Sequence, residues 1–582
     1  MKRLLIQLLL ILSAFSIATA APVTPDRAKN AAKQYLRHNL GHTVGIRQIE
    51  EPKVLTKSSS SAPAYYAFEA DGGGFVIIAG DDALPPVIGW SPTGSFSFED
   101  MPAHVAAWFT MWQNIADAVR NGRTAPLHGV RNEWEEIEMG TMPLYAAASR
   151  QLETAQWDQI PPFNNFCPNN SVAGCVAVAT AIVMRYHKWP EAGTGTLPFY
   201  NYTDDAGVSR SEGPIELGRK YDWDNMPLTV DDSTPIEAQD EIARLIHETG
   251  VMVRSNYNPD GTGAYSTDVY PGLVEYYGYD AGAFQYFKCY YSDSQWTAML
   301  TDNIDRVGPV YYSGYSDEGG HAFVLDGYSN GRFHINFGWG GRVDGFYTLP
   351  AFDEFTRGHS AILNIKKDEG GPVAEGLFID GYGSEQGLSC DTEEFITGEE
   401  FEVQVNYLFN MSARPFKGYI ALAIAHRDGS MGEIVAESDL LEIPAQFGYS
   451  YTITECVIFG DILIGDRLRL YYRSENTPEW TYIPANIEDG NTGEIPIADA
   501  QSLEEVTSFR YTSSSGELVL STKPDAQWSI TDAGGNPLEE GISFDAGVLT
   551  IDTSLYVEGS YILTLTKGYD SKTIEFVFGK KR

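Results

Sequence analysis

The sequence predicts an α+β protein of several domains, in which helices mix with strands at first and strands alone follow. The chain has 582 residues, more than one domain usually contains. Apolar residues recur with helical spacing in several segments before residue 366, and short runs of alternating apolar and polar residues dominate after residue 373. We therefore expect domains of different architecture along one chain.

Residues 1–20 have the pattern of a secretory signal peptide. Basic residues 2–3 precede an apolar run over 4–12, and small residues at 18–20 precede the expected cut. After this segment no apolar stretch approaches the roughly 18 residues that a membrane-spanning helix needs. We expect an exported bacterial protein that is secreted, attached to the cell surface or periplasmic, with no membrane span.

Residues 21–141 predict a small α+β domain. Thr24, followed by a proline, is a typical helix N-cap. Strands are expected over 64–70 and 74–79, and a second amphipathic helix over 103–120. The first helix places its apolar residues on one face: Ala28, Ala31, Ala32, Tyr35 and Leu36.

The segment 174–187 places a cysteine where a loop turns into an apolar helix. Unpaired N–H groups and the positive end of the helix dipole favour the thiolate form of Cys175. With an imidazolium nearby, a thiol pKa falls into the range of about 3.5–7.5. A lone cysteine in an apolar helix is more often a buried packing residue, so a catalytic role depends on a partner elsewhere in the chain.

A second segment downstream predicts a β-hairpin that carries this partner. If residues 326–331 form the loop, Leu325 pairs with Arg332, and His321 then lies opposite Asn336. Directly opposed side chains share one face of a sheet, with Cβ atoms roughly 5 Å apart. An amide in that place can bind one ring nitrogen and leave the other to accept a proton from a thiol.

Three ordered motifs resemble the streptopain family of secreted cysteine proteases. They are Gly-Cys-Val-Ala ending in Tyr-His at 174–187, Gly-His-Ala-Phe-Val at 320–324, and Asn-x-Gly-Trp-Gly-Gly at 336–341. The order Cys, His, Asn and its spacing also fit papain-type proteases. The resemblance implies a papain-like two-lobed protease domain that acts on proteins or peptides and uses no cofactor or metal.

The resemblance also implies a role for each site residue. Cys175 is the expected nucleophile, His321 the general base and then acid, and Asn336 the group that orients His321. Gln159 precedes a Pro-aromatic-Asn element and is expected in the oxyanion hole together with the backbone N–H of Cys175, with Gln156 as the competing candidate. Such a donor is typically worth about 2.7–4 kcal/mol in the transition state.

One motif departs from the family pattern. Relatives commonly have Trp-Gly-Trp after the asparagine, whereas this chain has Phe337 and Trp339 around a glycine. We expect Trp339 to form a wall of the site that shields the His–Asn hydrogen bond, although an ordinary core position is the alternative. Gly320 is expected to open room around His321.

Other polar residues near the motifs have simpler interpretations. His334 lies two residues before Asn336 and is a rival base on the same strand face. His187 ends the cysteine helix and is expected to be a favourable charge at its C-terminus. Asp326 is expected to be a turn former in the hairpin loop, away from Cys175.

The N-terminal domain resembles the propeptide of streptopain-like proteases through the residues at 72–82. The resemblance implies that residues 21–141 cover and inhibit the active site of a protease domain at 142–366 until they are cut away. Self-cleavage between about 140 and 150 is the expected maturation step. A permanent N-terminal domain or an ordinary linker is the alternative.

Charge and cysteine content exclude several classes of protein. The net charge of −39 and the pI near 4.5 disfavour nucleic-acid binding, which needs surplus Lys and Arg. Five cysteines are too few for a disulfide scaffold, and their odd number leaves at least one free thiol. Cys390 and Cys456 are candidates for a pair, and the state of Cys167 and Cys289 is open.

The C-terminal third predicts two β modules. Residues 373–498 are expected to form an immunoglobulin-like β-sandwich, and 499–582 a second β-rich module that weakly resembles bacterial sorting modules. Substrate docking, surface attachment and spacing are all open as their roles. Each of two sets of alternating residues is expected to lie on one face of its strand. The sets are Phe401, Val403, Val405, Tyr407 and Phe409, and Leu468 with Leu470.

Two other functions fit part of this pattern. A transglutaminase-like acyl transferase would use the same thiolate and pass the acyl group to an amine instead of water. A non-catalytic surface adhesin is favoured by the β modules and disfavoured by the intact set of Cys175, His321, Asn336 and Gln159.

Overall fold

The structure is a computed structural model, and its chain divides into two units, Met1–Ala374 and Glu375–Arg582. The expected signal peptide and most of the expected maturation segment lie outside the described residues. The structure describes residues 21–49, 62–99, 101–123, 130–142, 149–316, 319–349, 358–382, 385–392, 395–426, 429–460, 462, 466–486, 493–497, 509–512, 517–520, 527–532, 537–542, 549–552, 559–567 and 570–578.

The first unit begins with the predicted helix. Helix α2 (Pro25–Leu40) is capped by Thr24, whose hydroxyl oxygen accepts a hydrogen bond from the backbone N–H of Arg27. Its five predicted apolar residues are all buried, and α2 ends at Gly41 in the left-handed conformation. The predicted strands and second helix are also confirmed, as β2 (Tyr65–Ala70), β3 (Phe75–Ala79) and α3 (Ala103–Arg120).

One antiparallel sheet of eleven strands runs through the first unit. The N-terminal strands join it through β4 and β14, where Phe346 pairs with Trp90 and Tyr347 with Gly89. Short strand β5 (Arg150–Gln151) pairs with β12 beside the main path. The order of the other strands is β1 (Ile46–Ile49), β2, β3, β4 (Val87–Ser91), β14 (Gly345–Tyr347), β13 (Arg332–Asn336), β12 (Gly319–Ser329), β11 (Val310–Ser316), β15 (Ser360–Leu363) and β10 (Phe284–Phe287).

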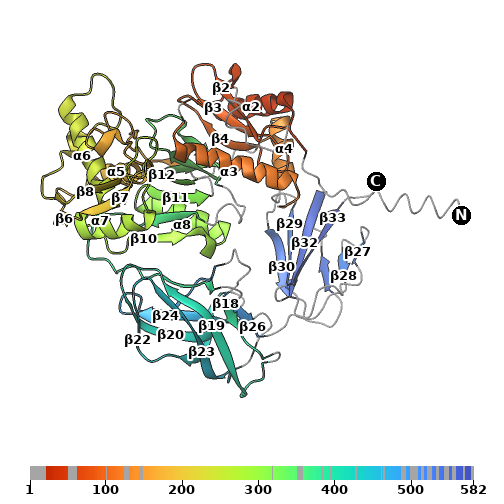
Figure 1. Cartoon of the computed structure of the whole chain (residues 1–582). Helices are drawn as coiled ribbons and strands as arrows, with labels where there is room; N and C mark the ends of the chain where they lie inside the picture. Colours follow the sequence, from red (N-terminus) through yellow and green to blue (C-terminus); the bar gives the residue numbers. More distant parts are fainter. Residues whose placement is uncertain are drawn as a thin grey trace. The chain divides into compact units, whose positions relative to one another are not determined.

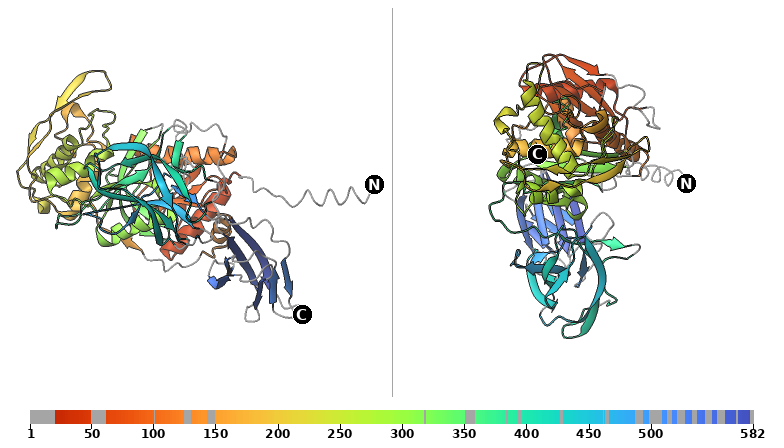
Figure 2. Two further views of the ribbon diagram at one scale, coloured as in Figure 1. Left: turned by 90° about the horizontal axis from the view of Figure 1, so that it is seen from below. Right: turned by 60° about the vertical axis from the view of Figure 1, so that its left-hand side comes forward.

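Helices cover both faces of the central strands and form two separate cores (Figure 1). On one face lie α2, α3, α4 (Val130–Met139) and α8 (Asp293–Arg306), and on the other lie α5 (Cys175–His187), α6 (Ile236–Met252) and α7 (Val269–Tyr277). The left view of Figure 2 shows α5–α7 at one end of this unit, next to two small hairpin sheets. These sheets pair β6 (Thr196–Leu197) with β9 (Ile215–Glu216) and β7 (Tyr200–Thr203) with β8 (Ser209–Glu212).

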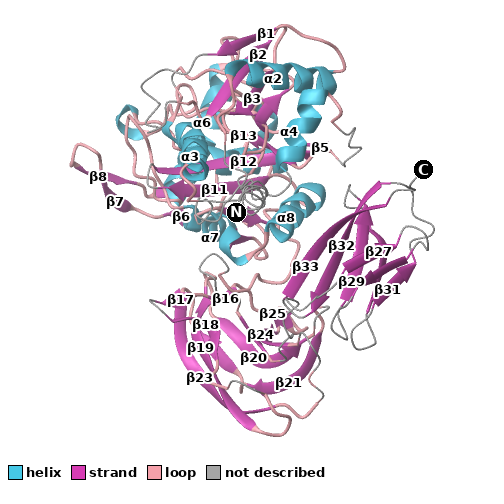
Figure 3. Cartoon of the chain, turned by 90° about the vertical axis from the view of Figure 1, so that its right-hand side faces the viewer, coloured by secondary structure: helices cyan, strands magenta, loops and turns pink. Residues whose placement is uncertain are grey.

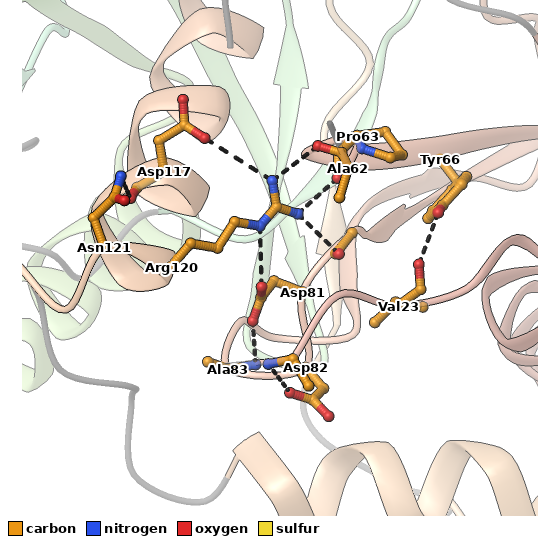
Figure 4. A network of polar contacts seen from close by, with 12 residues as sticks. Val23, Ala62, Pro63, Tyr66, Asp81, Asp82, Ala83, Asp117, Arg120 and Asn121 are labelled. Atoms are coloured by element: carbon orange, nitrogen blue, oxygen red, sulfur yellow. Dashed lines mark hydrogen bonds and ion pairs between the residues drawn. The ribbon is translucent and has the colours of Figure 1, made fainter. Parts of the chain in front are cut away.

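Helix α3 is fixed to the N-terminal strands by a largely covered arginine at its last position (Figure 4). Arg120 Nε lies 3.1 Å from Asp81 Oδ2, and its other two nitrogens donate to the backbone carbonyls of Ala62, Pro63 and Gly80 at 2.7–3.0 Å. Charge-assisted bonds of this kind are strong and directional. They hold α3 in one position over the sheet.

The described part of the second unit contains strands and no α-helix (Figure 3). Apolar residues of its first two sheets share one core. These sheets are β16 (Leu377–Ile379), β19 (Glu400–Asn410), β18 (Glu385–Ser389) and β17 (Gly381–Tyr382) with β23 (Phe447–Val457), and β21 (Met431–Glu437), β20 (Phe416–Ala425), β24 (Arg467–Ser474) and β25 (Thr481–Tyr482) with β22 (Leu441–Ile443) and β26 (Glu494–Pro496).

Two further sheets lie near the C-terminus. They are β27 (Phe509–Thr512), β28 (Glu517–Leu520) and β31 (Leu549–Asp552), and β30 (Pro537–Ile542), β29 (Gln527–Asp532), β32 (Gly559–Lys567) and β33 (Asp570–Phe578). Across the described residues of the chain, no helix is both long enough and apolar enough to cross a bilayer.

The face prediction for β24 is confirmed, whereas that for β19 is wrong in its second half. Leu468 and Leu470 of β24 are fully buried. In β19, Tyr407 has a φ of 62°, and the pairing with β23 shifts between Val405 and Leu408. This irregularity reverses the alternation, so that Leu408 is buried in place of Tyr407.

Candidate active site

Cys175 is the first residue of helix α5. The preceding Gly174 has a φ of 91°, and a Cβ atom there would lie 2.9 Å from Thr262 Cγ2 and 3.0 Å from the Thr262 carbonyl oxygen. This turn therefore requires a glycine, because other residues are strained at such a φ and there is no room for a side chain. The turn places Cys175 at the open N-terminus of the helix.

The thiol of Cys175 lies against the central strand β12. The backbone N–H groups of Ala322, Val176 and Cys175 itself favour the thiolate, but burial has the larger effect and raises the pKa of Cys175. The sequence predicts a lowered pKa beside an imidazolium. In this structure burial outweighs the helix terminus, so the thiol is protonated at neutral pH.

His321 lies on the other face of β12 from the thiol. Side chains alternate along this strand: Ala322 and Val324 belong to the core that α5 covers, and Phe323 belongs to the core that α3 covers. The His321 ring is stacked on Phe323, with ring centroids 5.5 Å apart and planes 7° apart. Cys175 packs against the first of these cores. The two residues thus meet the same strand from opposite sides.

A cluster of aromatic rings surrounds His321. The Trp108 ring of α3 meets it edge to face at 6.0 Å, and the His359 ring does so at 5.3 Å. Across the strand pair lies Gly314, where a Cβ atom would be 2.5 Å from both His321 Nε2 and His359 Cδ2. His321 is 4% exposed, so these neighbours enclose it almost completely.

The hairpin register differs from the predicted one. Asn336 pairs with Val324, not with His321, because β12 continues to Ser329 and the loop is the two-residue turn Asn330-Gly331. Both turn residues have positive φ values, 51° and 73°, as a tight hairpin turn requires. Val324 faces α5, so Asn336 lies on the same face of the sheet as Cys175.

Asp326 is not a turn former, which corrects the sequence-based expectation. It lies inside β12 at a register shift between Leu325 and Gly327, and it is 2% exposed. His334 Nδ1 lies 2.5 Å from Asp326 Oδ1. His334 is therefore committed to a buried ion pair, which leaves it badly placed to act as the rival base.

Gln159 lies next to the start of the cysteine helix. Its carbonyl oxygen accepts a hydrogen bond of 2.9 Å from the N–H of Ala173, two residues before Cys175. Its side chain is buried, whereas that of Gln156 is exposed. A polar pocket of about 660 Å³ opens beside this segment, and its lining includes Gln156, Asp158, Ile160, Gly340 and Arg342.

The two aromatic residues that follow Asn336, Phe337 and Trp339, are both buried in the core that α3 covers. The ring centroid of Phe337 lies 6.3 Å from that of Trp108 and 5.5 Å from that of Phe323, so Phe337 belongs to the surroundings of His321. Trp339 is 2% exposed, and the Arg342 guanidinium lies over its ring at 4.3 Å. In the described conformation Trp339 is a core aromatic, and its predicted role as a wall of the site stays a prediction.

Three smaller expectations concern nearby residues. Gly320 is exposed, which is consistent with open space at the start of β12. Burial lowers the pKa of His187 to about 4, so this residue is neutral at pH 7 and does not supply the expected charge. All five cysteines are free thiols, including the candidate pair Cys390 and Cys456.

Comparisons with known proteins connect this arrangement to a family. Residues 157–347 match the model of the Peptidase C10 family, and residues 20–116 match the Spi protease inhibitor model. Streptopain of Streptococcus pyogenes is 28% identical over 411 residues, an alignment that covers 63% of this chain and 99% of streptopain. The chain belongs to the peptidase C10 family. Residues 157–347 are therefore a cysteine peptidase domain, preceded by an inhibitor-type domain.

Two other relatives of this C10 peptidase differ in length. The thiol protease/hemagglutinin PrtT of Porphyromonas gingivalis is 27% identical over 373 residues, which are 62% of this chain and 42% of PrtT. The chain thus spans less than half the length of that relative. The prointerpain A fragment of Prevotella intermedia aligns with 27% identity and a TM-score of 0.46, over 56% of this chain and 100% of the fragment.

Sequence reasoning missed three residues of the C10 peptidase site region. Trp108 and His359 enclose His321, and Thr154 donates a hydrogen bond to Asp326 and accepts one from Asn336. Nothing local marks them, since each is an isolated residue outside the three motifs. The described residues contain no group of three or more His, Cys, Asp or Glu side chains placed to hold a metal ion.

Proposed function

We propose that this chain is a cysteine endopeptidase made as an inactive precursor, with Cys175 as nucleophile and His321 as general base and then acid. One observation carries the proposal: the thiol at the N-terminus of α5 lies at the backbone N–H of Ala322, the neighbour of His321. A reorientation of His321 at the beginning of β12 would bring imidazole and thiol together. Gly319 and Gly320 precede it and impose little resistance to such a change.

The chemistry follows from these groups. His321 takes the thiol proton, and the Cys175 sulfur attacks the substrate carbonyl carbon to form a tetrahedral oxyanion. The side-chain amide of Gln159 and the backbone N–H of Cys175 stabilise this oxyanion. His321 then protonates the leaving amine. Water, deprotonated by His321, hydrolyses the thioester and restores the thiol, while Asn336 keeps the imidazole in place.

The N-terminal domain acts as an intramolecular inhibitor by holding His321 on the wrong face of β12. Trp108 contributes the ring that encloses His321, and Arg120 fixes α3, the helix that carries Trp108. Burial, and then the nearby Lys288, lower the pKa of His359 to about 3, so the His359 ring is uncharged near neutral pH. Cleavage between about 140 and 150 would let α3 leave and release His321.

The remaining architecture is part of the same proposal. The α5–α7 side and the sheet form the two lobes of a papain-like domain at 142–366, and the polar pocket beside Gln159 offers room for an extended substrate. The shared core of two antiparallel sheets supports an Ig-like sandwich at 373–498. We further propose that residues 1–20 direct export and that 499–582 are a second β module.

Product analysis tests this function directly. The processed enzyme is incubated with a peptide library in water enriched in ¹⁸O, and products are analysed by mass spectrometry. Endopeptidase activity predicts new carboxyl ends that carry one ¹⁸O atom. Cross-linked peptides without new ends would instead establish acyl transfer, and an unchanged library from wild-type enzyme would contradict both.

A further inference from the structure

A buried chain of polar side chains leads away from Asn336. Asn336 Nδ2 lies 3.0 Å from Thr154 Oγ1, and Thr154 Oγ1 donates to Asp326 Oδ2. Asp326 Oδ1 in turn lies 2.5 Å from His334 Nδ1. All four residues are at most 8% exposed, so water competes little for these bonds.

We propose that Thr154, Asp326 and His334 are positioning residues that fix the side-chain amide of Asn336, so that only its oxygen is left to orient His321. This inference rests on the proposed peptidase function. It concerns which atom of Asn336 faces the imidazole, and therefore which nitrogen of His321 can act as the base.

The direction of each bond follows from counting hydrogens. The Asp326 carboxylate has none, so the single hydroxyl hydrogen of Thr154 points toward it. Thr154 Oγ1 can then only accept from Asn336, which assigns nitrogen to that position of the amide. The second Asn336 N–H donates to the carbonyl oxygen of Ala155 at 2.9 Å. Both N–H groups of the amide are thus used.

The amide oxygen of Asn336 keeps one free lone pair. Its other lone pair accepts the backbone N–H of Gly338 at 3.0 Å. An acceptor that faces His321 requires a ring nitrogen that carries hydrogen, and the second ring nitrogen is then unprotonated and available to the Cys175 thiol. A flipped amide would present N–H groups and favour the opposite tautomer, which cannot take the thiol proton.

The charges around Asp326 support this arrangement. Burial alone would lower the pKa of His334, but the adjacent Asp326 and the nearby Asp344 outweigh it and raise the pKa. A protonated His334 places a positive charge beside the Asp326 carboxylate, whose other oxygen accepts the hydrogen bond of Thr154. Asp344, which accepts the backbone N–H of Phe337 at 3.0 Å, is the other titratable group that faces His334.

The N-terminal segment of the protease domain supplies Thr154, the link between Asn336 and Asp326 in this chain of bonds. Residues 150–151 pair with β12 at Tyr328 and Gly327, and the N–H of Leu152 donates to the Asp326 carbonyl oxygen at 2.7 Å. The register shift at Asp326 turns its side chain toward both partners. Maturation must therefore leave this segment in place, because it carries Thr154.

Substitutions of Thr154 in the full chain, processed to the mature enzyme, test the inference. Thr154→Val removes the hydroxyl with almost no change of shape, and Thr154→Ser restores it. Thr180→Val is the matched control, because the Thr180 hydroxyl is buried and bonds to the Val176 carbonyl of its own helix. For Thr154→Val we expect a fall in kcat of roughly tenfold or more with KM within about twofold, since misplaced catalytic groups cost rate.

A second measurement separates positioning from loss of fold. The rate of alkylation of Cys175 by iodoacetamide, followed against pH, reports the Cys–His ion pair. A Cys–His ion pair should make the thiol of the processed wild type reactive at low pH. Thr154→Val should lose this reactivity, whereas Thr154→Ser and Thr180→Val should keep it. If Thr154→Val does not fold, Asp326→Asn is measured instead. The new amide can donate to Thr154, so the Thr154 hydroxyl no longer has to donate toward residue 326. This variant should cause the same losses.

The outcomes distinguish the two proposals. A processed wild type that cleaves peptides, together with a Thr154→Val enzyme of unchanged kcat and unchanged alkylation profile, would overturn the positioning role alone. A wild type that cleaves no peptide would overturn the proposed function, and this inference with it.

Discussion

The two faces of strand β12 carry different candidate catalytic residues in different surroundings. On the α5 face, Cys175 stands at a helix N-terminus and Asn336 is held by three hydrogen bonds. On the α3 face, His321 is enclosed by aromatic rings that include Trp108 of the N-terminal domain. In the proposed mechanism, the nucleophile and the orienting group are thus in place before maturation, and the base is withheld. Inhibition of this kind needs no contact with the thiol itself.

Removal of the nucleophile should have the largest effect. Cys175→Ala is expected to abolish peptide cleavage and to leave the purified precursor uncut, because the proposed maturation is self-cleavage. Gel analysis of the isolated precursor over time measures this. Cys456→Ala, a buried thiol of the second unit, is the control and should mature normally. Maturation of isolated Cys175→Ala would show that self-cleavage is wrong.

Loss of the orienting amide should come next. Asn336→Ala in the processed enzyme is expected to lower kcat by about 10- to 100-fold, because the imidazole loses its partner. The matched control is Asn303→Ala, which removes another buried amide that bonds to the Gly308 carbonyl and the Asn364 N–H. Equal rates for Asn336→Ala and wild type would remove Asn336 from the site.

The packing around His321 on the α3 face can be changed by a substitution outside the proposed catalytic residues. Trp108→Ala should free His321 in the uncut precursor and speed maturation by about tenfold, at a cost of about 3–5 kcal/mol in stability. Trp112→Ala removes an equally large buried ring one turn further along α3 and controls for that cost. The half-time of precursor cleavage is the measurement. If both variants mature at one rate, Trp108 does not restrain His321.

The smallest expected effect concerns pH. Burial raises the pKa of Asp344 from 3.8 to about 7. The folded protein then keeps a proton that the unfolded chain loses, so stability should fall as pH rises from about 4 to about 7, by at most about 1.4 kcal/mol per unit. Asp344→Asn should flatten this fall in denaturant titrations, and the exposed Asp232→Asn should not. An unchanged slope in Asp344→Asn would contradict the assignment.

Local patterns predicted the elements well because their causes are local. The Thr24 cap and the apolar face of α2 predict that helix within a few residues, and the apolar face of α3 does so without a side-chain cap. The glycine turn before Cys175 likewise marks the start of α5. Cys175, Gln159 and Asn336 could therefore be placed near one another from motifs and family resemblance.

The prediction of the hairpin register was wrong because contacts between residues far apart in sequence hold Asp326 in the strand. Aspartate is common in turns, so the residue type alone predicts that Asp326 belongs to the loop. Its charge is instead satisfied inside the strand by His334 and by Thr154, which is 172 residues away in sequence. The Asn330-Gly331 dipeptide, a strong hairpin signal, was the better guide. His321 contacts Trp108, which lies more than 200 residues earlier, and no local pattern encodes this contact.

The pairing of β4 with β14 has a consequence for the mature enzyme. While the N-terminal domain is attached, the backbone groups of Phe346 and Tyr347 are covered by Trp90 and Gly89. If the proposed cleavage releases that domain, β14 becomes an edge strand whose amides and carbonyls on that side face water. An unpaired edge strand can form backbone hydrogen bonds with an extended polypeptide. Activation would therefore also create a pairing site for a released propeptide, a substrate or another enzyme molecule.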